Sequence, residues 1–99
     1  MYFQQGDVLI TKIDYEVKGE ELEHLTLAEG EATGHHHSIV EGLGQLIMMD
    51  KLMHLQIFSK EATLKHQEHK EIILPKGNYR IDIIREYDPF EDEIRRVRD

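Results

Sequence analysis

The feature of this chain that most constrains its fold is the lack of a helical repeat. Before the last ten residues, no stretch keeps its apolar residues at the spacing of about 3.6 that marks an amphipathic helix. Short apolar segments, some alternating with polar residues, are instead separated by Gly, Asp, Asn and Pro, which favour turns. Many short strands at such spacing are typical of barrels and sandwiches. We therefore predict an all-β domain of antiparallel strands, either a small barrel or a two-sheet sandwich.

The predicted strands are short and lie close together, at residues 8–13, 24–28, 35–41, 45–50, 52–59, 62–65, 71–74 and 79–87. Asp50-Lys51 is expected to join a hairpin, residues 16–23 to form a charged loop, and Pro75-Lys76-Gly77-Asn78 to form a turn. Alternation along the last strand places Tyr79 on its apolar face. We therefore expect this side chain in the core, with its hydroxyl group at a boundary.

The length of 99 residues fits one domain with a modest core. We expect this domain to cover residues 1–99, with residues 89–99 as a peripheral tail. With 39% hydrophobic and 32% charged residues, the core is thin, and small domains of this kind often need a metal ion or a partner subunit. Several strands must also lie at sheet edges, which proteins commonly cover. We therefore expect a homodimer.

The net charge of −8 argues against several functions. An acidic surface repels phosphate backbones, so nucleic-acid binding is not expected. The chain has no cysteine, which excludes disulfides, Cys-ligated zinc and thiol catalysis. Residues 1–5 lack the basic start and apolar run of a signal peptide. The longest apolar stretch, around residues 46–49, is far too short for a membrane span. We expect a cytoplasmic protein without a membrane partner.

Histidine is the residue type that points to chemistry. The chain contains seven histidines, and five of them fall in two groups, at residues 35–37 and at His66 and His69. Imidazole is the commonest metal ligand among protein side chains, and it titrates close to neutral pH. The sequence therefore indicates a metal site or a proton-binding site, without naming a substrate.

Strand geometry decides what the first group can do. In an extended strand, His35 and His37 lie on one face and His36 turns to the other. Glu41 lies further along the first face. Two imidazoles and one carboxylate leave coordination positions open, as metal catalysis requires. We therefore predict a divalent metal ion (Zn, Fe, Mn or Ni) at His35, His37 and Glu41. An open position leaves room for a small-molecule ligand, but no catalytic residue is assigned and no other cofactor is expected.

The second group allows two geometries. In a strand, His66 and His69 face opposite ways, whereas a helical turn brings both rings together. Either geometry lets this pair add a nitrogen to the predicted metal site, provided that the two segments are neighbours. The alternative is a non-catalytic interaction or structural domain whose histidines form only a polar network or a pH-sensitive surface. We expect His24 to be exposed, and His54 to be half-buried with its ring hydrogen-bonded.

The run of residues 30–41 resembles the first metal motif of the cupins, Gly-x5-His-x-His-x3–4-Glu-x6-Gly. The two histidines and the glutamate of that motif fall on His35, His37 and Glu41. Residues 75–77 are similar to the Pro-x-Gly turn of the second cupin motif. The resemblance implies a cupin-like barrel that holds a metal ion.

The chain departs from the cupin pattern at three positions. Gly30 is one residue too close to His35. Met48 stands where the closing glycine belongs, and Arg80 stands where the second motif has its histidine. If the resemblance holds, the fourth ligand comes from His66 or His69.

A second resemblance is to a set of small bacterial and phage proteins. These proteins carry Thr-Gly-His-x-His, His-x-Glu-His and Leu-Pro-x-Gly-x-Tyr segments, which match residues 33–37, 66–69 and 74–79 of this chain. The resemblance covers residues 5–90. It implies membership of a family and carries no activity.

Overall fold

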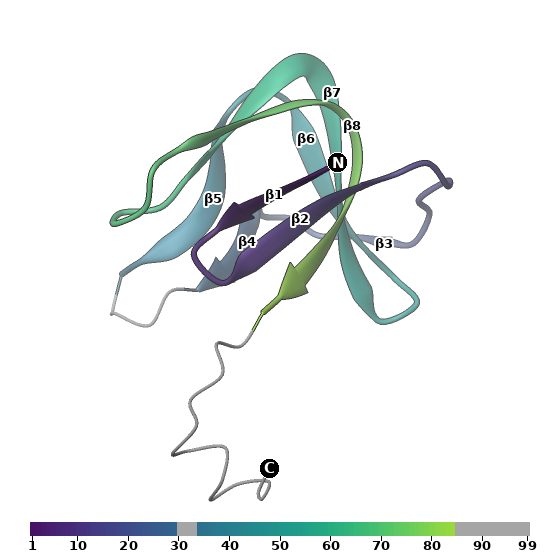
Figure 1. Cartoon of the computed structure of the whole chain (residues 1–99). Helices are drawn as coiled ribbons and strands as arrows, with labels where there is room; N and C mark the ends of the chain where they lie inside the picture. The colour runs from purple at the N-terminus through teal and green to yellow at the C-terminus, as the bar shows by residue number, and fades with distance from the viewer. Residues whose placement is uncertain (30–33, 85–99) are drawn as a thin grey trace, which may run out of the picture.

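The computed structural model describes residues 1–29 and 34–84 (Figure 1), and every regular element in these residues is a β-strand. The predicted all-β fold is therefore confirmed. The predicted tail at residues 89–99 and the end of the strand predicted at 79–87 lie outside the described residues. The strands are β1 (Tyr2–Gln5), β2 (Val8–Ile13), β3 (Glu20–Glu21), β4 (Thr26–Glu29), β5 (His36–Glu41), β6 (Gly44–Met49), β7 (Leu52–Lys65) and β8 (Ile72–Ile83).

The strands form one antiparallel sheet in the order β1-β2-β8-β7-β5-β4, with β6 joining β7 to β3. The long strand β7 is the centre of this sheet. It pairs with β8 along both halves, with β6 along its first half and with β5 along its second half. Figure 1 shows β7 and β8 curving so strongly that β4 and β5 come round toward β1 and β2. The end strands β1 and β4 do not pair in the described sheet, so it is compatible with the predicted sandwich and is not a closed barrel.

Two hairpin turns follow simple backbone rules. Asp50 and Lys51 both have positive φ, at 55° and 65°, as a two-residue turn of type I′ requires. This predicted hairpin is confirmed. Gly6 and Asp7 join β1 to β2, with Gln5 opposite Val8, and Gly6 has a φ of 60°. A glycine at the first central position is typical of a type II′ turn. Strand β1 was not predicted, although this Gly-Asp pair is the usual signal for such a hairpin.

The predicted turn at residues 75–78 is wrong. These residues continue β8 from Ile72 to Ile83 without a break. They lie opposite an irregularity in β7, since Pro75 pairs with Glu61, Gly77 pairs with Ile57, and the register shifts between these two positions. A bulge interrupts the hydrogen-bond ladder, so a proline without an N–H group is tolerated there. The same bulge explains why the strands predicted at 52–59 and 62–65 form one bent strand.

The concave side of the curled sheet holds the apolar core. Tyr79 is fully buried, and its hydroxyl group donates a hydrogen bond to the Pro75 carbonyl oxygen. His54 is also buried, more deeply than predicted, and both ring nitrogens have partners, the Tyr15 hydroxyl and the Leu52 carbonyl oxygen. The core consists of Val8, Ile10, Leu27, Ile39, Leu46, Leu55, Ile57, Ala62, Leu64, Leu74, Tyr79 and Ile81.

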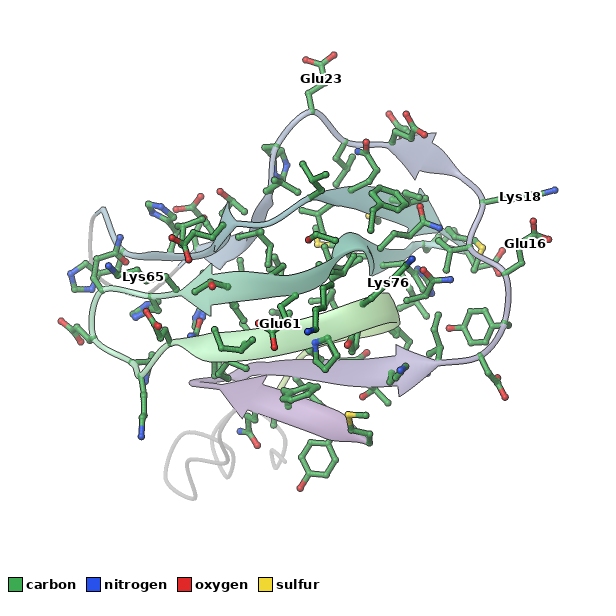
Figure 2. All side chains as sticks on the ribbon, turned by 90° about the horizontal axis from the view of Figure 1, so that it is seen from above. Glu16, Lys18, Glu23, Glu61, Lys65 and Lys76 are labelled. Carbon is green, nitrogen blue, oxygen red and sulfur yellow. The ribbon has the colours of Figure 1, made fainter. Side chains whose placement is uncertain are left out.

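The charged segment at residues 16–23 is mainly an exposed loop, as predicted, and contains only the two-residue strand β3. Figure 2 shows the side chains of Glu16, Lys18 and Glu23 pointing away from the sheet. His24 next to this loop is exposed, which also agrees with the prediction. Among residues 1–29 and 34–84, there is no helix long and apolar enough to cross a bilayer.

Candidate functional site

Four histidines from two distant segments lie side by side in the folded chain. His35 lies directly before β5 and His37 lies at its start, whereas His66 and His69 come from the loop between β7 and β8. The pairing of Ser38 with Lys65 brings these segments together. We call these four residues the histidine cluster. Their ring centroids are separated by 4.3 Å (His37–His66), 4.6 Å (His66–His69), 5.6 Å (His35–His66) and 5.9 Å (His37–His69).

The second pair adopts neither a strand nor a helix. Residues 66–70 form an irregular loop, and this loop brings the rings of His66 and His69 together, as a helical turn would have done. His66 is buried, whereas His69 is exposed. The cluster therefore has an inner side, formed by His37 and His66, and an outer side that is open to solvent.

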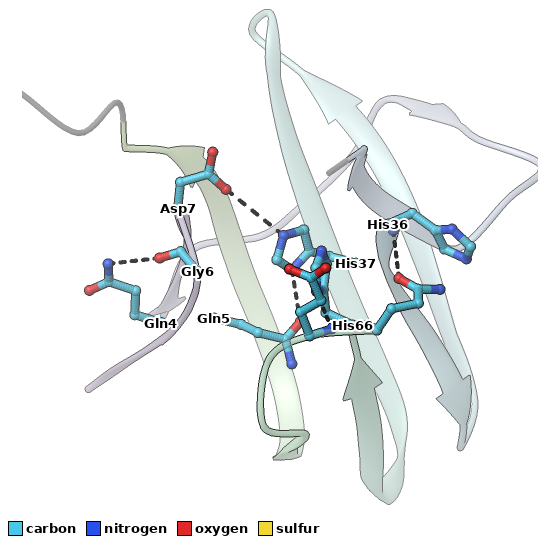
Figure 3. A network of polar contacts seen from close by, with 9 residues as sticks. Gln4, Gln5, Gly6, Asp7, His36, His37 and His66 are labelled. Carbon is cyan, nitrogen blue, oxygen red and sulfur yellow. Dashed lines mark hydrogen bonds and ion pairs between the residues drawn. The ribbon is translucent and has the colours of Figure 1, made fainter. Parts of the chain in front are cut away.

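Gln5 holds His37 from the inside of the protein. The Gln5 side-chain amide donates hydrogen bonds from Nε2 to the carbonyl oxygens of Leu64, at 3.1 Å, and Lys70, at 3.0 Å. Both amide hydrogens are thus used, and Oε1 faces Nδ1 of His37 at 2.8 Å (Figure 3). Because this oxygen can only accept a hydrogen bond, Nδ1 of His37 must carry the proton. In the neutral ring, Nε2 then keeps its lone pair.

That lone pair faces a carboxylate. Nε2 of His37 lies 3.8 Å from Oδ1 of Asp7 in the β1–β2 turn, and the two groups point toward one another in Figure 3. The preceding glycine makes room for the rings, because a Cβ atom on Gly6 would lie 2.7 Å from Nε2 of His69 and 3.3 Å from Cε1 of His37. The β1–β2 turn and the two rings therefore enclose one small region. Sequence reasoning missed Gln5, Gly6 and Asp7 as parts of the site.

His66 and His35 have partners of their own. Nδ1 of His66 accepts a hydrogen bond from the backbone N–H of Glu68 at 3.0 Å, so a neutral His66 ring carries its proton on Nε2. Nδ1 of His35 lies 3.4 Å from Oε2 of Glu68. His36 lies beside the cluster, and its backbone N–H donates to Gln67.

Burial and mutual repulsion keep the inner rings neutral. The pKa of His37 is lowered from 6.5 to about 4, mainly by burial and next by repulsion from His66. The Asp7 carboxylate acts in the opposite direction and raises this pKa. Burial also lowers the pKa of His66, followed by repulsion from His69 and His35. Neutral imidazole is the form that binds metal ions. In its neutral form, the His37 ring keeps a free lone pair on Nε2.

Glu41 lies outside the cluster. It is exposed at the opposite end of β5, and its carboxylate accepts a hydrogen bond from Thr63 at 3.3 Å. Glu41 lies four positions after His37 along the strand, which corresponds to about 13 Å of extended chain, and the register shifts between Ile39 and Glu41. The carboxylate that faces His37 belongs to Asp7 instead.

The histidine cluster does not have the geometry of a metal site in this conformation. Among the described residues, no three His, Cys, Asp or Glu side chains stand in an arrangement that could hold an ion as they are. Asp7 and His69, which border the same small region, are both exposed. Exposed side chains change rotamers readily.

No curated protein and no solved structure matches the chain. The family described as "Domain of unknown function (DUF8820)" matches residues 4–84. This range includes the whole histidine cluster together with Gln5 and Asp7, and the chain belongs to that family.

Proposed function

We propose that this protein binds one divalent metal ion at the histidine cluster, with His37, His69 and Asp7 as its ligands. The observation that carries the proposal is the 3.8 Å separation between Nε2 of His37 and Oδ1 of Asp7. Both atoms are acceptors, and neither has a proton to share when the ring is neutral and held by Gln5. Two ligand atoms of one tetrahedral zinc ion lie about 3.4 Å apart, given bonds of about 2.0–2.2 Å. A small movement of Asp7 toward His37 would therefore bring the two atoms to the separation that one bound cation requires.

His69 is the third ligand in this proposal. Its ring is nearly parallel to that of His37, with an angle of 15° between the ring planes. Its Nε2 atom lies beside Gly6, which places it next to the region that Asp7 borders. A rotation of this exposed side chain would complete a set of two histidines and one carboxylate, which leaves further coordination positions open.

His66 and His35 support the site rather than complete it. While His66 accepts the hydrogen bond from Glu68, its Nε2 atom carries a proton and offers no lone pair. The His66 ring packs against His37 and His69, and His35 is held by the carboxylate of Glu68. Supporting contacts of this kind fix the orientation of the ligands.

The donor set restricts the choice of ion. Imidazole and carboxylate groups without thiolate suit Zn, Fe, Mn and Ni, the ions that the sequence suggests. A bound ion would act as a Lewis acid toward a water molecule or a small-molecule ligand in an open position.

A second candidate function is a metal-free polar network. It is favoured by the hydrogen bonds of His37 to Gln5 and of His66 to the Glu68 amide, which satisfy one nitrogen of each buried ring. This account needs no ligand for Nε2 of His37. Zinc binding to the metal-free protein therefore separates the two functions.

Zinc titration of untagged, chelator-stripped protein tests the proposal. We expect isothermal titration calorimetry to give one ion per chain. Asp7→Asn and His69→Gln should each weaken binding by at least about tenfold, since losing a ligand costs no less than losing a group behind it. Both side chains are exposed, so the variants should keep the fold.

Two control variants exclude binding by the histidine run alone. His24→Gln changes an exposed histidine outside the cluster, and His36→Gln interrupts residues 35–37 without replacing a proposed ligand. Both should bind zinc like the wild type. If His36→Gln weakens binding and Asp7→Asn does not, the ion sits on the surface run and the proposed site is wrong.

A further inference from the structure

We infer that Gln5 is a positioning residue that sets the tautomer of His37 and thereby keeps the lone pair of Nε2 free to bind a metal ion. The role of Nε2 in binding a metal ion rests on the proposed function, whereas the effect of Gln5 on the tautomer does not. Gln5 is 2% exposed and ends β1. A buried amide so close to a candidate ligand needs a reason, because polar groups are costly to bury without partners.

The orientation of the Gln5 amide is fixed by its surroundings. Nε2 lies at hydrogen-bond distance from two carbonyl oxygens, one in β7 and one in the loop before β8. Carbonyl oxygens only accept hydrogen bonds, so the NH2 group must face them. The opposite assignment would place Oε1 against two acceptors. Oε1 is therefore directed at His37, and it can only accept.

Two acceptors compete for the single proton of the neutral His37 ring. Oε1 of Gln5 lies 2.8 Å from Nδ1, which is a normal hydrogen-bond length. Oδ1 of Asp7 lies 3.8 Å from Nε2, which is too long for one. The Gln5 contact is also buried, where a hydrogen bond is stronger than in water. The proton therefore stays on Nδ1, and Nε2 points to the Asp7 carboxylate with its lone pair.

Removing Gln5 reverses this balance. Without Oε1, the Nδ1–H group loses its acceptor inside the protein, and the Asp7 carboxylate becomes the better partner. The proton moves to Nε2, where it blocks the lone pair that the metal requires. Gln5 and Asp7 both belong to the β1–β2 hairpin, so docking of this hairpin on β7 prepares the site.

Nitrogen-15 NMR of the histidine rings, recorded with chelator at about pH 7.5, reads the tautomer directly. We expect wild-type His37 to carry its proton on Nδ1. Gln5→Leu should move it to Nε2 and weaken zinc binding about tenfold to a hundredfold, the range for groups behind a metal ligand.

Gln4→Leu is the matched control. Gln4 is the neighbour of Gln5 in β1 and is exposed, and among the described residues its side chain hydrogen-bonds only to the Gly6 carbonyl oxygen. Its replacement should change neither the tautomer nor zinc affinity. A purely structural role for Gln5 would lower stability without moving the ring proton.

The inference is overturned if wild-type His37 carries its proton on Nε2, or if a folded Gln5→Leu protein keeps it on Nδ1. The wild-type spectrum decides the first point even where Gln5→Leu does not fold. A protein that shows the expected tautomers and binds no zinc would contradict the proposed function and leave the role of Gln5 in place.

Discussion

Lowering the pH of the metal-free protein from 6.5 to about 4 is expected to reduce its free energy of unfolding by up to about 3 kcal/mol. The pKa of His37 falls from 6.5 to about 4 on folding. Between these pH values, the unfolded chain therefore binds a proton on this ring and the folded chain does not. Stability therefore rises with pH between these values and is lost as the pH falls. His66 acts in the same direction because its pKa is also lowered.

Urea denaturation at several pH values, with chelator present, measures this effect. His37→Gln removes the titrating ring and should flatten the dependence between pH 6.5 and about 4, whereas His24→Gln should leave it unchanged. Carboxylates add a common background at the acid end, so the difference between wild type and His37→Gln is the informative quantity. Equal pH dependence in these two proteins would show that His37 is not held neutral.

Gly42→Ala is expected to destabilise the protein by about 2–5 kcal/mol. Gly42 has a φ of 98°, which side-chain-bearing residues rarely adopt. A Cβ atom there would lie 2.6 Å from the Glu61 carbonyl oxygen and 2.7 Å from the Cα atom of Ala62. Both are backbone atoms of β7, so the neighbour cannot turn aside. The substitution would force β5 and β7 apart just beyond their last paired residues.

Gly34→Ala separates backbone strain from this clash. Gly34 also has a positive φ, of 84°, but no atom of the described residues lies within 4 Å of the added Cβ position. Gly34→Ala should therefore lower the free energy of unfolding only by the backbone strain, about 1–2 kcal/mol. The free energy of unfolding from urea titration checks both variants. Equal losses in the two would mean that β5 and β7 are not packed as closely as described.

Local sequence patterns predicted much of the sheet. Strand β2 has the predicted bounds, and the hairpin at Asp50-Lys51 is where two alternating segments meet. The pattern failed where long-range pairing overrides local preference. Residues 75–77 carry strong turn residues, yet they stay extended because β7 bulges opposite them. No single-segment signal reveals which distant strand will carry a bulge.

The candidate site could be predicted only in part. The number and spacing of the histidines indicated that residues 35–37 and 66–69 should be considered together, and the register of β5 with β7 makes them neighbours. Asp7 and Gln5 could not be found in this way, because curvature of the whole sheet brings the first hairpin to β5. The strand alternation and the cupin motif both point to Glu41, but neither accounts for its distance from His37 along β5. The homodimer and the cupin relationship stay predictions.

Elemental analysis of the untagged protein, purified without a nickel column, tests the central claim most directly. Nickel must be avoided because residues 35–37 would bind it adventitiously. We predict about one Zn, Fe, Mn or Ni ion per chain, a melting temperature that falls when a chelator removes it, and loss of the ion in an Asp7→Asn, His69→Gln double variant. A metal-free protein whose melting temperature responds neither to zinc nor to chelator would contradict the proposed metal site.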